Sequence, residues 1–467
     1  MSEDPSIEDR SGSRIRVAVV GSGPAGFYAA GALLTSQEPK AAVDLIDRLP
    51  TPWGLVRLGV APDHPKIKAV SRAFEKIARQ PGFRFFGNVQ LGRDVTHAEL
   101  AERYDAVIYA VGAQTDRQLG IPGEELPGSW PATAFVAWYN GHPDFQELEF
   151  DLSHERAVVI GNGNVALDVA RVLALTPEEL APTDTTDAAI EAINGAGVKE
   201  ILVVGRRGPV QAAWTPVEVG ELGELAGADV LVDPAALDLD SASAAELEAA
   251  PPTVKRNVEH LRAYADRPVA GKRRSIRLQF HASPVAILGD GRVEAIELVR
   301  NTLVDGHAMP TGETEMVECG IVFRSVGYRG VALPGVPFDH RGGTVPNDRG
   351  RALDPDGERV PGLYCAGWIK RGPSGVIGTN KKDATETVEL LLEDARGGRL
   401  PEATDEDLEQ LLAERGLAPV VYAGWEAIDA SERSRSEPLG RPRVKHSTWD
   451  ELLTAAQAPR ADRQLDG

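Results

Sequence analysis

Val17-Ala18-Val19-Val20-Gly21-Ser22-Gly23-Pro24-Ala25-Gly26 is the stretch that decides the fold, because an apolar run leads directly into a G-x-G-x-x-G turn. An apolar strand followed by this turn and a helix is typical of a Rossmann-type βα unit. The first glycine makes the tight bend, the second lets the backbone approach a pyrophosphate, and the third packs the helix against the strand. The helix N-terminus then faces the negative charge. One copy is weak evidence, because short glycine patterns also form ordinary strand-to-helix turns.

A second copy of the pattern lies about 140 residues further along the chain. Ala157-Val158-Val159-Ile160 runs into Gly161-Asn162-Gly163-Asn164-Val165-Ala166, a G-x-G-x-x-A turn. Two such turns, each after an apolar run, predict two dinucleotide sites in one chain. We therefore expect an α/β protein with two Rossmann-like domains of the glutathione-reductase type, which carries electrons from one dinucleotide to another.

The strands that follow the two turns end in residues of opposite charge. The first, Ala42-Val43-Asp44-Leu45-Ile46-Asp47, ends where a carboxylate accepts both hydroxyls of an adenosine ribose in FAD and NAD sites. The second, Ile201-Leu202-Val203-Val204-Gly205, ends in Arg206 and Arg207, which suit the 2′-phosphate of NADP. The first site is therefore predicted to bind FAD and the second NADP(H). The alternatives are that Asp47 is an ordinary acid at the end of a strand and that the two arginines are solvated and bind no ligand.

Length and composition are those of a large globular enzyme. The chain of 467 residues exceeds the usual limit of about 250–300 for one core, so two domains are expected. Hydrophobic residues make up 42%, charged residues make up 26%, and the formal net charge is −20. The acidic, polar start argues against a signal peptide, and no apolar run approaches the length of a membrane span. We expect a cytoplasmic protein with neither a membrane span nor a nucleic-acid partner.

The two cysteines, Cys319 and Cys365, lie far apart in the sequence. They form no C-x-x-C redox pair, and the chain lacks the four-cysteine spacing of an iron–sulfur centre. We interpret them as two small buried thiols. This excludes the disulfide-reductase class of flavoproteins, and no metal site is predicted. Electrons must then enter or leave through the flavin alone.

The pattern of strands and turns divides the chain into four parts. We expect an FAD-binding domain made of residues 1–115 and 323–398, with an NADP-binding domain inserted at 116–322. Apolar strands are expected at 104–112, 321–327 and 362–368, and a helix at about 380–393. Residues 399–467 change from acidic to basic and turn-rich, and we interpret them as a peripheral C-terminal extension.

Several long stretches resemble one known family. They are Pro52-Trp53-Gly54-Leu55-Val56-Arg57-Leu58-Gly59-Val60-Ala61-Pro62-Asp63-His64-Pro65, the run of residues 160–171, Gly205-Arg206-Arg207-Gly208-Pro209, Gly367-Trp368-Ile369-Lys370-Arg371-Gly372-Pro373 and Gly375-Val376-Ile377-Gly378-Thr379-Asn380-Lys381-Lys382. In this order they are similar to the adrenodoxin-reductase-like ferredoxin–NADP(+) reductases, over residues 15 to about 395. The resemblance implies FAD, NADPH and a ferredoxin-type iron–sulfur protein as the electron partner.

Matched position by position, the resemblance also implies roles for individual residues. His64 and Glu221 correspond to a histidine–carboxylate pair near the flavin that handles protons, although Pro216 departs from the family's pattern close to that pair. The positions that correspond to FAD contacts are Gly21, Gly23, Ala25, Gly26, Asp47, Leu55, Leu91, Trp368, Gly375, Val376 and Ile377. The positions that correspond to the NADP path are Arg117, Asn162, Gly163, Asn164, Val165, Arg206, Arg207 and Glu218.

The expected charge repulsion between this chain and its partner is the basis for predicting a docking site. A net charge of −20 and the usual acidity of ferredoxins imply overall repulsion, so association by charge needs a local basic face. Residues 254–277 carry eight basic and two acidic side chains, and three of the basic ones fall on one expected helix: Lys255, Arg256 and Arg262. We expect docking there, with a solvated basic face as the alternative.

Other functions are compatible with the same cofactors. An FAD/NADPH monooxygenase uses a similar fold, but the sequence has no signature of a pocket for an organic substrate. A general NADPH diaphorase or a non-catalytic redox module would lack a dedicated electron acceptor. A glutamate-synthase-type small subunit carries N-terminal cysteine clusters, which this chain lacks. The favoured prediction is an enzyme, a ferredoxin–NADP(+) reductase that passes a hydride from NADPH to FAD and then single electrons to a ferredoxin.

Overall fold

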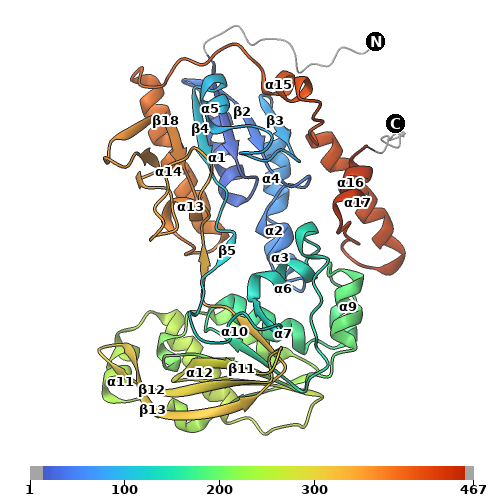
Figure 1. The fold of residues 1–467 in the computed structure, drawn as a ribbon, viewed down its shortest axis with the longest axis vertical. Coiled ribbons are helices and arrows are strands. Elements are labelled where there is room, and N and C mark those ends of the chain that lie inside the picture. Colours follow the sequence, from blue (N-terminus) through green and yellow to red (C-terminus); the bar gives the residue numbers. More distant parts are fainter. Residues whose placement is uncertain (1–13, 458–467) are drawn as a thin grey trace.

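The computed structural model describes residues 14–457, which form two units, each built on its own sheet (Figure 1). The first sheet has seven strands in the order β16-β17-β18-β4-β1-β2-β3. Its inner strand β1 runs parallel to both neighbours and is buried from Val17 to Val20, which explains its continuous apolar run. The strands are β1 (Arg14–Val20), β2 (Lys40–Ile46), β3 (Phe83–Phe86), β4 (Ala106–Tyr109), β16 (Asn347–Asp348), β17 (Arg351–Leu353) and β18 (Arg359–Cys365).

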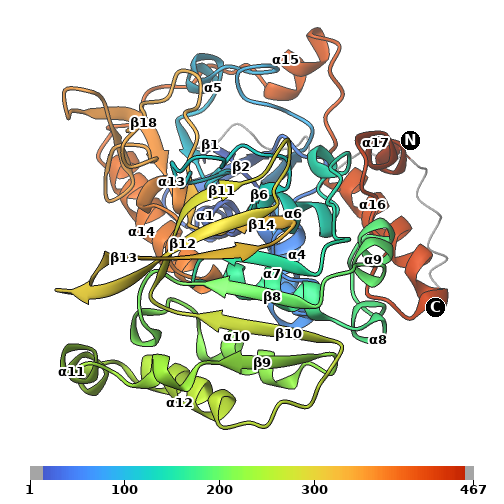
Figure 2. The ribbon, with the colours of Figure 1, turned by 60° about the horizontal axis from the view of Figure 1, so that its bottom comes forward.

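The second unit contains a parallel sheet of six strands in the order β6-β14-β7-β8-β10-β9. A three-stranded antiparallel sheet packs on one face of this sheet, and helices cover the other face (Figure 2). The strands are β6 (Ser129–Pro131), β7 (Arg156–Ile160), β8 (Glu200–Val204), β9 (Ala228–Val232), β10 (Arg274–Gln279) and β14 (Ile321–Arg324), with β11 (Ala282–Leu288), β12 (Ala295–Val304) and β13 (His307–Glu318) in the smaller sheet. The helices are α6 (Ala132–Tyr139), α7 (Asn164–Ala174), α8 (Pro177–Leu180), α9 (Asp187–Asn194), α10 (Pro216–Glu221), α11 (Ser241–Ala249) and α12 (Pro252–Ala265).

Two short strands connect the units. β5 (Thr115–Asp116) pairs antiparallel with β15 (Tyr328–Arg329), so the chain enters and leaves the second unit side by side. The domain boundary that we expected between residues 322 and 323 falls inside β14. β14 pairs in parallel with both β6 and β7 and is buried throughout, so the inserted unit extends at least to Arg324.

The helix that follows the last strand of the first sheet is longer than expected. The sequence predicts a helix at about 380–393, whereas α14 covers Ile377–Arg396 and packs along α1 (Pro24–Leu34). The hydroxyl of Thr379 accepts a hydrogen bond from the backbone N–H of Val376, which satisfies a donor at the start of the helix. The remaining helices of this unit are α2 (Leu55–Leu58), α3 (Pro65–Lys68), α4 (Ser71–Ala78), α5 (His97–Arg103) and α13 (Trp368–Arg371).

The C-terminal extension is part of the fold, so its interpretation as peripheral and turn-rich was wrong. It forms α15 (Leu408–Glu414), α16 (Tyr422–Ser436) and α17 (Trp449–Gln457) along one side of the first unit (Figure 1). Trp425 and Ile428 are buried in the core of that unit, and the ring of Trp425 lies 4.7 Å from that of Trp53. Val420 and Gly87 exchange backbone hydrogen bonds of 2.8 Å, which fasten the extension beside β3.

Two further expectations concern the membrane and the cysteines. Between residues 14 and 457, no helix has the length and apolar character needed to cross a membrane, and the cytoplasmic location stays a prediction. Cys319 and Cys365 are buried and free, and burial raises the pKa of each thiol to about 12. Such thiols stay protonated at neutral pH, in agreement with their interpretation as buried structural residues.

Candidate active site

The first glycine turn is shaped for the close approach of a ligand. A Cβ on Gly26 would lie 1.9 Å from the carbonyl oxygen of Gly21, so the helix can meet the strand here only through a glycine. A Cβ on Gly23, in contrast, would have no neighbour within 4 Å. No side chain caps α1 at Gly23, so its first amide groups face this open space. These features fit a pyrophosphate held by backbone N–H groups.

The carboxylate of Asp47 is fixed beside this turn. It follows the last residue of β2 and accepts hydrogen bonds from the backbone N–H of Ser22 at 2.7 Å and of Leu49 at 2.9 Å. The hydroxyl of Ser22 donates to the same carboxylate at 2.5 Å. A carboxylate offers about four acceptor positions, and the hydroxyl of Ser22 can rotate away. Asp47 can therefore accept from ribose hydroxyls while the turn keeps its backbone contacts.

The segment 52–58 and the start of α1 meet at a second close contact. Gly54 has φ +51°, and a Cβ there would lie 2.9 Å from the Cα of Gly23. This contact brings Leu55 next to the first turn, where its side chain is 42% exposed. Leu91 is half-buried and packs against the core on the other face of the sheet.

The start of α13 also lies beside the first glycine turn. A Cβ on Gly367 would lie 2.7 Å from the Cβ of Ala25, so the N-terminus of α13 lies directly on α1. The indole N–H of Trp368 donates to the carbonyl of Ser374, which holds the loop that leads into α14. The exposed side chains of this loop include Val376, at 59% exposure, and the backbone of Gly375 has φ +80°. Ile377 is the first residue of α14.

The second glycine turn repeats the arrangement of the first. A Cβ on Gly161 would lie 2.1 Å from the carbonyl oxygen of Ser325, whereas one on Gly163 would have no neighbour within 4 Å. No side chain caps α7 at Gly163. The side chain of Asn162 covers Gly205, and the side chain of Asn164 accepts a hydrogen bond from the backbone N–H of Thr215 at 2.8 Å. Val165, in the first turn of α7, is half-buried.

Three arginines remain available around the second turn. Arg206 is exposed and Arg207 is half-buried at the end of β8, and neither forms an ion pair with a carboxylate of residues 14–457. Within the described part of the chain, the guanidinium of Arg207 donates only to the carbonyl of Gln211, at 3.4 Å. Arg117 is exposed beside β5, and its backbone N–H donates to the carbonyl of Gly327 at 2.8 Å. Guanidinium groups without a carboxylate partner are free to bind an anion.

His64 and Glu221 meet across the two units. The carboxylate of Glu221 lies 2.7 Å from Nε2 of His64, and that of Glu218 lies 3.8 Å away. Both acids belong to α10, which begins where the hydroxyl of Thr215 accepts a hydrogen bond from the backbone N–H of Glu218. Pro216 occupies the first position of this helix, where proline is favoured. The departure from the family's pattern therefore helps to start α10.

Sequence reasoning missed the residue that organises this cluster, Arg171. Its guanidinium is buried and donates to Asp63 at 2.7 Å, to Asp168 at 2.9 Å and to Glu218 at 3.2 Å. Asp63 belongs to the first unit and Arg171 to α7 of the second, so this contact joins the units beside His64. The spacing of Asp168 and Arg171 along one helix, inside the run 160–171 that carries the resemblance, could have drawn attention to it.

The cluster holds more carboxylates than its guanidinium can neutralise. Arg171 lies within 4 Å of Asp63, Asp168, Glu218 and Glu221. Burial, reinforced by the charge of Asp168, raises the pKa of Glu218 to about 7. Burial also raises the pKa of Asp168, whereas hydrogen bonds from Arg171 outweigh burial and lower the pKa of Asp63. A proton is thus shared within this cluster near neutral pH, next to the imidazole of His64.

The predicted basic face lies elsewhere on the second unit and is smaller than expected. Lys255, Arg256 and Arg262 are exposed on α12. Arg274 is buried and donates to the carbonyls of Val198 and Ile193, so its inclusion in the basic face was wrong. Burial is possible because main-chain acceptors replace water around its guanidinium.

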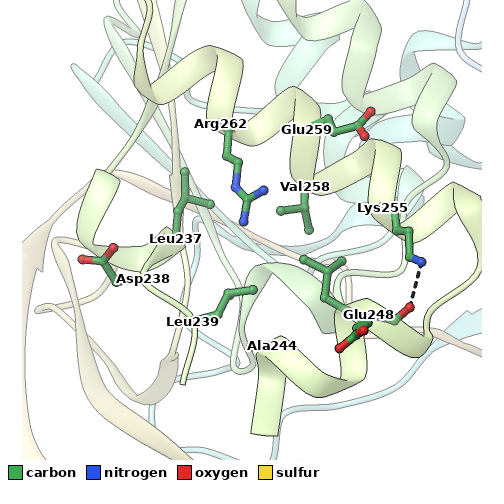
Figure 3. A pocket seen from close by; sticks show the side chains of 10 residues that line it. Leu237, Asp238, Leu239, Ala244, Glu248, Lys255, Val258, Glu259 and Arg262 are labelled. Atoms are coloured by element: carbon green, nitrogen blue, oxygen red, sulfur yellow. Dashed lines mark hydrogen bonds between the residues drawn. The ribbon is translucent and has the colours of Figure 1, made fainter. Parts of the chain in front are cut away.

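A groove of about 660 Å³ adjoins this face (Figure 3). Leu237, Leu239 and Val258 point into the groove, and Arg262 lies over it (Figure 3). The acids Asp238, Glu248 and Glu259 also line it, so the groove itself is not a basic surface.

Together, the fold and the site define a two-unit oxidoreductase with one dinucleotide-binding turn in each unit. Residues 15–187 match the family described as pyridine nucleotide-disulphide oxidoreductase. The chain is 52% identical over 454 residues to the NADPH-ferredoxin reductase FprA of Mycobacterium tuberculosis, covering 94% of this chain and 98% of that relative. It is 44% identical over 458 residues to the human mitochondrial NADPH:adrenodoxin oxidoreductase, covering 94% and 91%.

A solved structure of Mycobacterium tuberculosis FprA in complex with NADPH superimposes with a TM-score of 0.90 at 50% identity, covering 95% of this chain and all of that one. The expected fold class, with its two dinucleotide-binding domains, is thereby confirmed. The chain belongs to the adrenodoxin-reductase-like family of ferredoxin–NADP(+) reductases.

The raised pKa of Glu218 predicts how stability depends on pH. The folded protein keeps a proton on Glu218 up to about pH 7, whereas the unfolded chain loses it near the ordinary pKa of 4.5. The folded state therefore binds more protons in this window, and its stability falls as the pH rises from 4.5 to 7. In Glu218→Gln this contribution, on the order of 1–3 kcal/mol, should disappear. The variant's melting temperature should then fall less than the parent's between pH 5 and pH 8.

The control for this experiment is Glu224→Gln, which changes an exposed acid shortly after α10. It should follow the pH profile of the parent. An unchanged profile in Glu218→Gln would show that Glu218 is ionised throughout this range and that the proton resides elsewhere.

Proposed function

We propose that this chain is an FAD-dependent ferredoxin–NADP(+) reductase. It takes a hydride from NADPH and delivers electrons one at a time to a ferredoxin-type iron–sulfur protein. The observation that carries the proposal is the chemical difference between two similar turns. One has the fixed carboxylate of Asp47 at its edge, and the other has the guanidinium groups of Arg206 and Arg207, which have no carboxylate partner among residues 14–457. A carboxylate suits ribose hydroxyls and repels a 2′-phosphate, whereas the arginines attract it.

We assign the first unit to FAD and the second to NADP(H). Bound FAD supplies the chemistry that joins a two-electron donor to a one-electron acceptor. The residues proposed to hold it are Gly21, Gly23, Ala25, Gly26, Asp47, Leu55, Leu91, Trp368, Gly375, Val376 and Ile377. The residues proposed to bind NADP(H) are Arg117, Asn162, Gly163, Asn164, Val165, Arg206, Arg207 and Glu218. The exposed side chains of Leu55 and Val376 support the first assignment, because an apolar ring system would cover them.

We further propose that His64 and Glu221 handle protons at this interface. Their hydrogen bond of 2.7 Å connects the imidazole to a cluster of acids that shares a proton near neutral pH. Burial of His64 restricts its contact with bulk water, so protons would reach it through Glu221, which is only partly buried. An imidazole can accept a proton at one ring nitrogen and donate one from the other.

The first test of this proposal is whether the purified chain is a yellow protein with about one FAD. NADPH should bleach the flavin absorbance in a stopped-flow experiment, and a ferredoxin added next should restore it while becoming reduced itself. A colourless folded protein that takes up no FAD would contradict the assignment. Reoxidation by oxygen alone, with no ferredoxin reduction and with an organic product formed, would favour a monooxygenase. Reoxidation only by artificial acceptors would favour a diaphorase.

The two arginines predict coenzyme preference. Arg206→Ala/Arg207→Ala should lower the preference for NADPH over NADH by about 2–4 kcal/mol, because each charged hydrogen bond contributes roughly 1.5–3 kcal/mol before solvent compensation. The loss should fall on NADPH binding and leave NADH nearly unchanged, as measured by the Kd of each coenzyme. Arg277→Ala, an exposed arginine on the neighbouring strand β10, is the control. Equal losses for both coenzymes would show that the pair supports the fold instead.

The docking surface predicts a dependence on salt. We propose that the ferredoxin docks through Lys255, Arg256 and Arg262, whose side chains are exposed on α12. Ferredoxin reduction should slow steeply as the Debye length falls to about 10 Å near 0.1 M salt, while NADPH-to-ferricyanide turnover changes little. Arg256→Glu/Arg262→Glu should reduce ferredoxin slowly even at low salt and should lose the steep dependence.

A charge-matched control is Arg292→Glu/Arg300→Glu, in which both residues are exposed, Arg292 in the turn between β11 and β12 and Arg300 on β12. The smaller sheet packs on the face of the six-stranded sheet opposite the helices. This control should reduce ferredoxin like the parent. If the α12 variant also matches the parent at low salt, the partner docks elsewhere.

A further inference from the structure

The C-terminal extension carries a fully buried acid, Glu432, that contacts the first unit. The guanidinium of Arg57 donates to it through two hydrogen bonds of 2.8 and 2.5 Å, and Arg443 donates at 3.0 Å. Burial alone would raise the pKa of Glu432, but the two guanidinium groups outweigh it and hold the pKa at about 2. Arg57 lies in α2, which follows the contact of Gly54 with the first glycine turn. The extension thus holds the segment beside the proposed flavin site.

The buried side-chain nitrogen of Lys445, in the same extension, contacts both units. Its side chain is 0% exposed, and Nζ donates to the carbonyl of Arg57 at 3.1 Å, in the first unit. Nζ also donates to the carbonyl of Asn140 at 3.0 Å and lies 3.2 Å from Asp184, both in the second unit. Asp184 accepts a further hydrogen bond of 2.6 Å from Lys68 of the first unit. Lys445 and Asp184 therefore form the centre of a junction at which the extension, the first unit and the second unit meet.

Two flanking contacts strengthen the junction. Arg441 donates to the carbonyl of Thr183 at 3.0 Å and to the carboxylate of Asp187 at 2.5 Å, at the start of α9. In both views the extension lies beside α9 (Figures 1 and 2). The indole N–H of Trp449 donates to Asp144 at 2.9 Å, and the same carboxylate accepts a hydrogen bond from Arg48, the residue after Asp47.

These contacts matter because the two dinucleotide turns lie on different units. Hydride transfer requires the reacting atoms to be about 3–3.5 Å apart, and a misplacement of about 1 Å can cost about 100-fold in rate. The units are linked by β5 and β15, a pair of only two residues each, which leaves their relative angle to side-chain contacts. Arg171 with Asp63 fixes one point of the interface, and the junction at Lys445 fixes another.

We propose that residues 425–449 act as a clamp that sets the angle between the two units, with Lys445 as its positioning residue. The proposal rests on the proposed function, since it is the alignment of the nicotinamide with the flavin that the clamp would maintain. Lys445 touches neither cofactor site and acts through Arg57, Asn140 and Asp184.

The test is Lys445→Met, which keeps the length of the side chain and removes its charge and hydrogen bonds. The purified holoenzyme should keep its FAD and a Kd for NADP+ within about twofold of the parent, since each site lies within one unit. The rate of flavin reduction by NADPH should fall at least about tenfold, and the long-wavelength charge-transfer absorbance of the complex should weaken. Arg433→Met is the matched control, because Arg433 is exposed and, among residues 14–457, its guanidinium pairs with Asp429 of its own helix and with no other carboxylate. It should behave like the parent.

Amide hydrogen exchange gives a second readout that does not depend on turnover. In Lys445→Met, and in Arg441→Met if the first variant folds poorly, exchange should become faster on both sides of the junction, in residues 54–58 and 183–187. Parent-like flavin reduction and parent-like exchange in either folded variant would overturn the clamp. If the parent itself is not reduced by NADPH, the proposed function fails, whereas the exchange experiment still decides whether the junction holds the units together.

Discussion

One buried guanidinium, that of Arg171, holds together the place where the two dinucleotide-binding units meet. It lies on α7, the helix opened by the second glycine turn, and reaches Asp63, five residues after the segment 52–58 that contacts the first turn. The same guanidinium binds Glu218 and so fixes α10, which carries Glu221 to His64. Removing one partner of a buried ion pair typically costs about 3–5 kcal/mol, because the other charge stays buried and uncompensated. The geometry of the histidine–carboxylate pair therefore depends on a residue that touches neither member of the pair at hydrogen-bond distance.

At Arg171 and at Lys445 the two units are joined by hydrogen bonds between buried side chains and their partners. Such contacts are directional, whereas an apolar interface tolerates sliding. Directional contacts suit a reaction that needs its reacting atoms aligned to within about an ångström.

The sequence shows where the backbone needs a glycine, but it does not show which side chains from distant segments contact one another. The turns at Gly21 and Gly161 were predictable because a Cβ at either position would collide with main-chain atoms, a constraint that leaves a fixed spacing of glycines. Asp47 and Arg206 were predictable as candidates because strand ends in this fold face the ligand. The pairing of Arg171 with Asp63 joins residues separated by 108 positions and leaves no periodic trace. The burial of Trp425 was missed for the same reason, since its partner Trp53 lies in another segment.

The proposed clamp also bears on how electrons leave the protein. The basic residues proposed for docking are on α12 of the second unit, whereas the flavin is assigned to the first. A partner that docks on one unit can reach a flavin on the other only if the angle between the units is fixed. The contacts that align the nicotinamide for hydride transfer therefore also set the distance from the docked iron–sulfur centre to the flavin. Entry of the hydride and exit of the single electrons would thus depend on the same two buried junctions, at Arg171 and at Lys445.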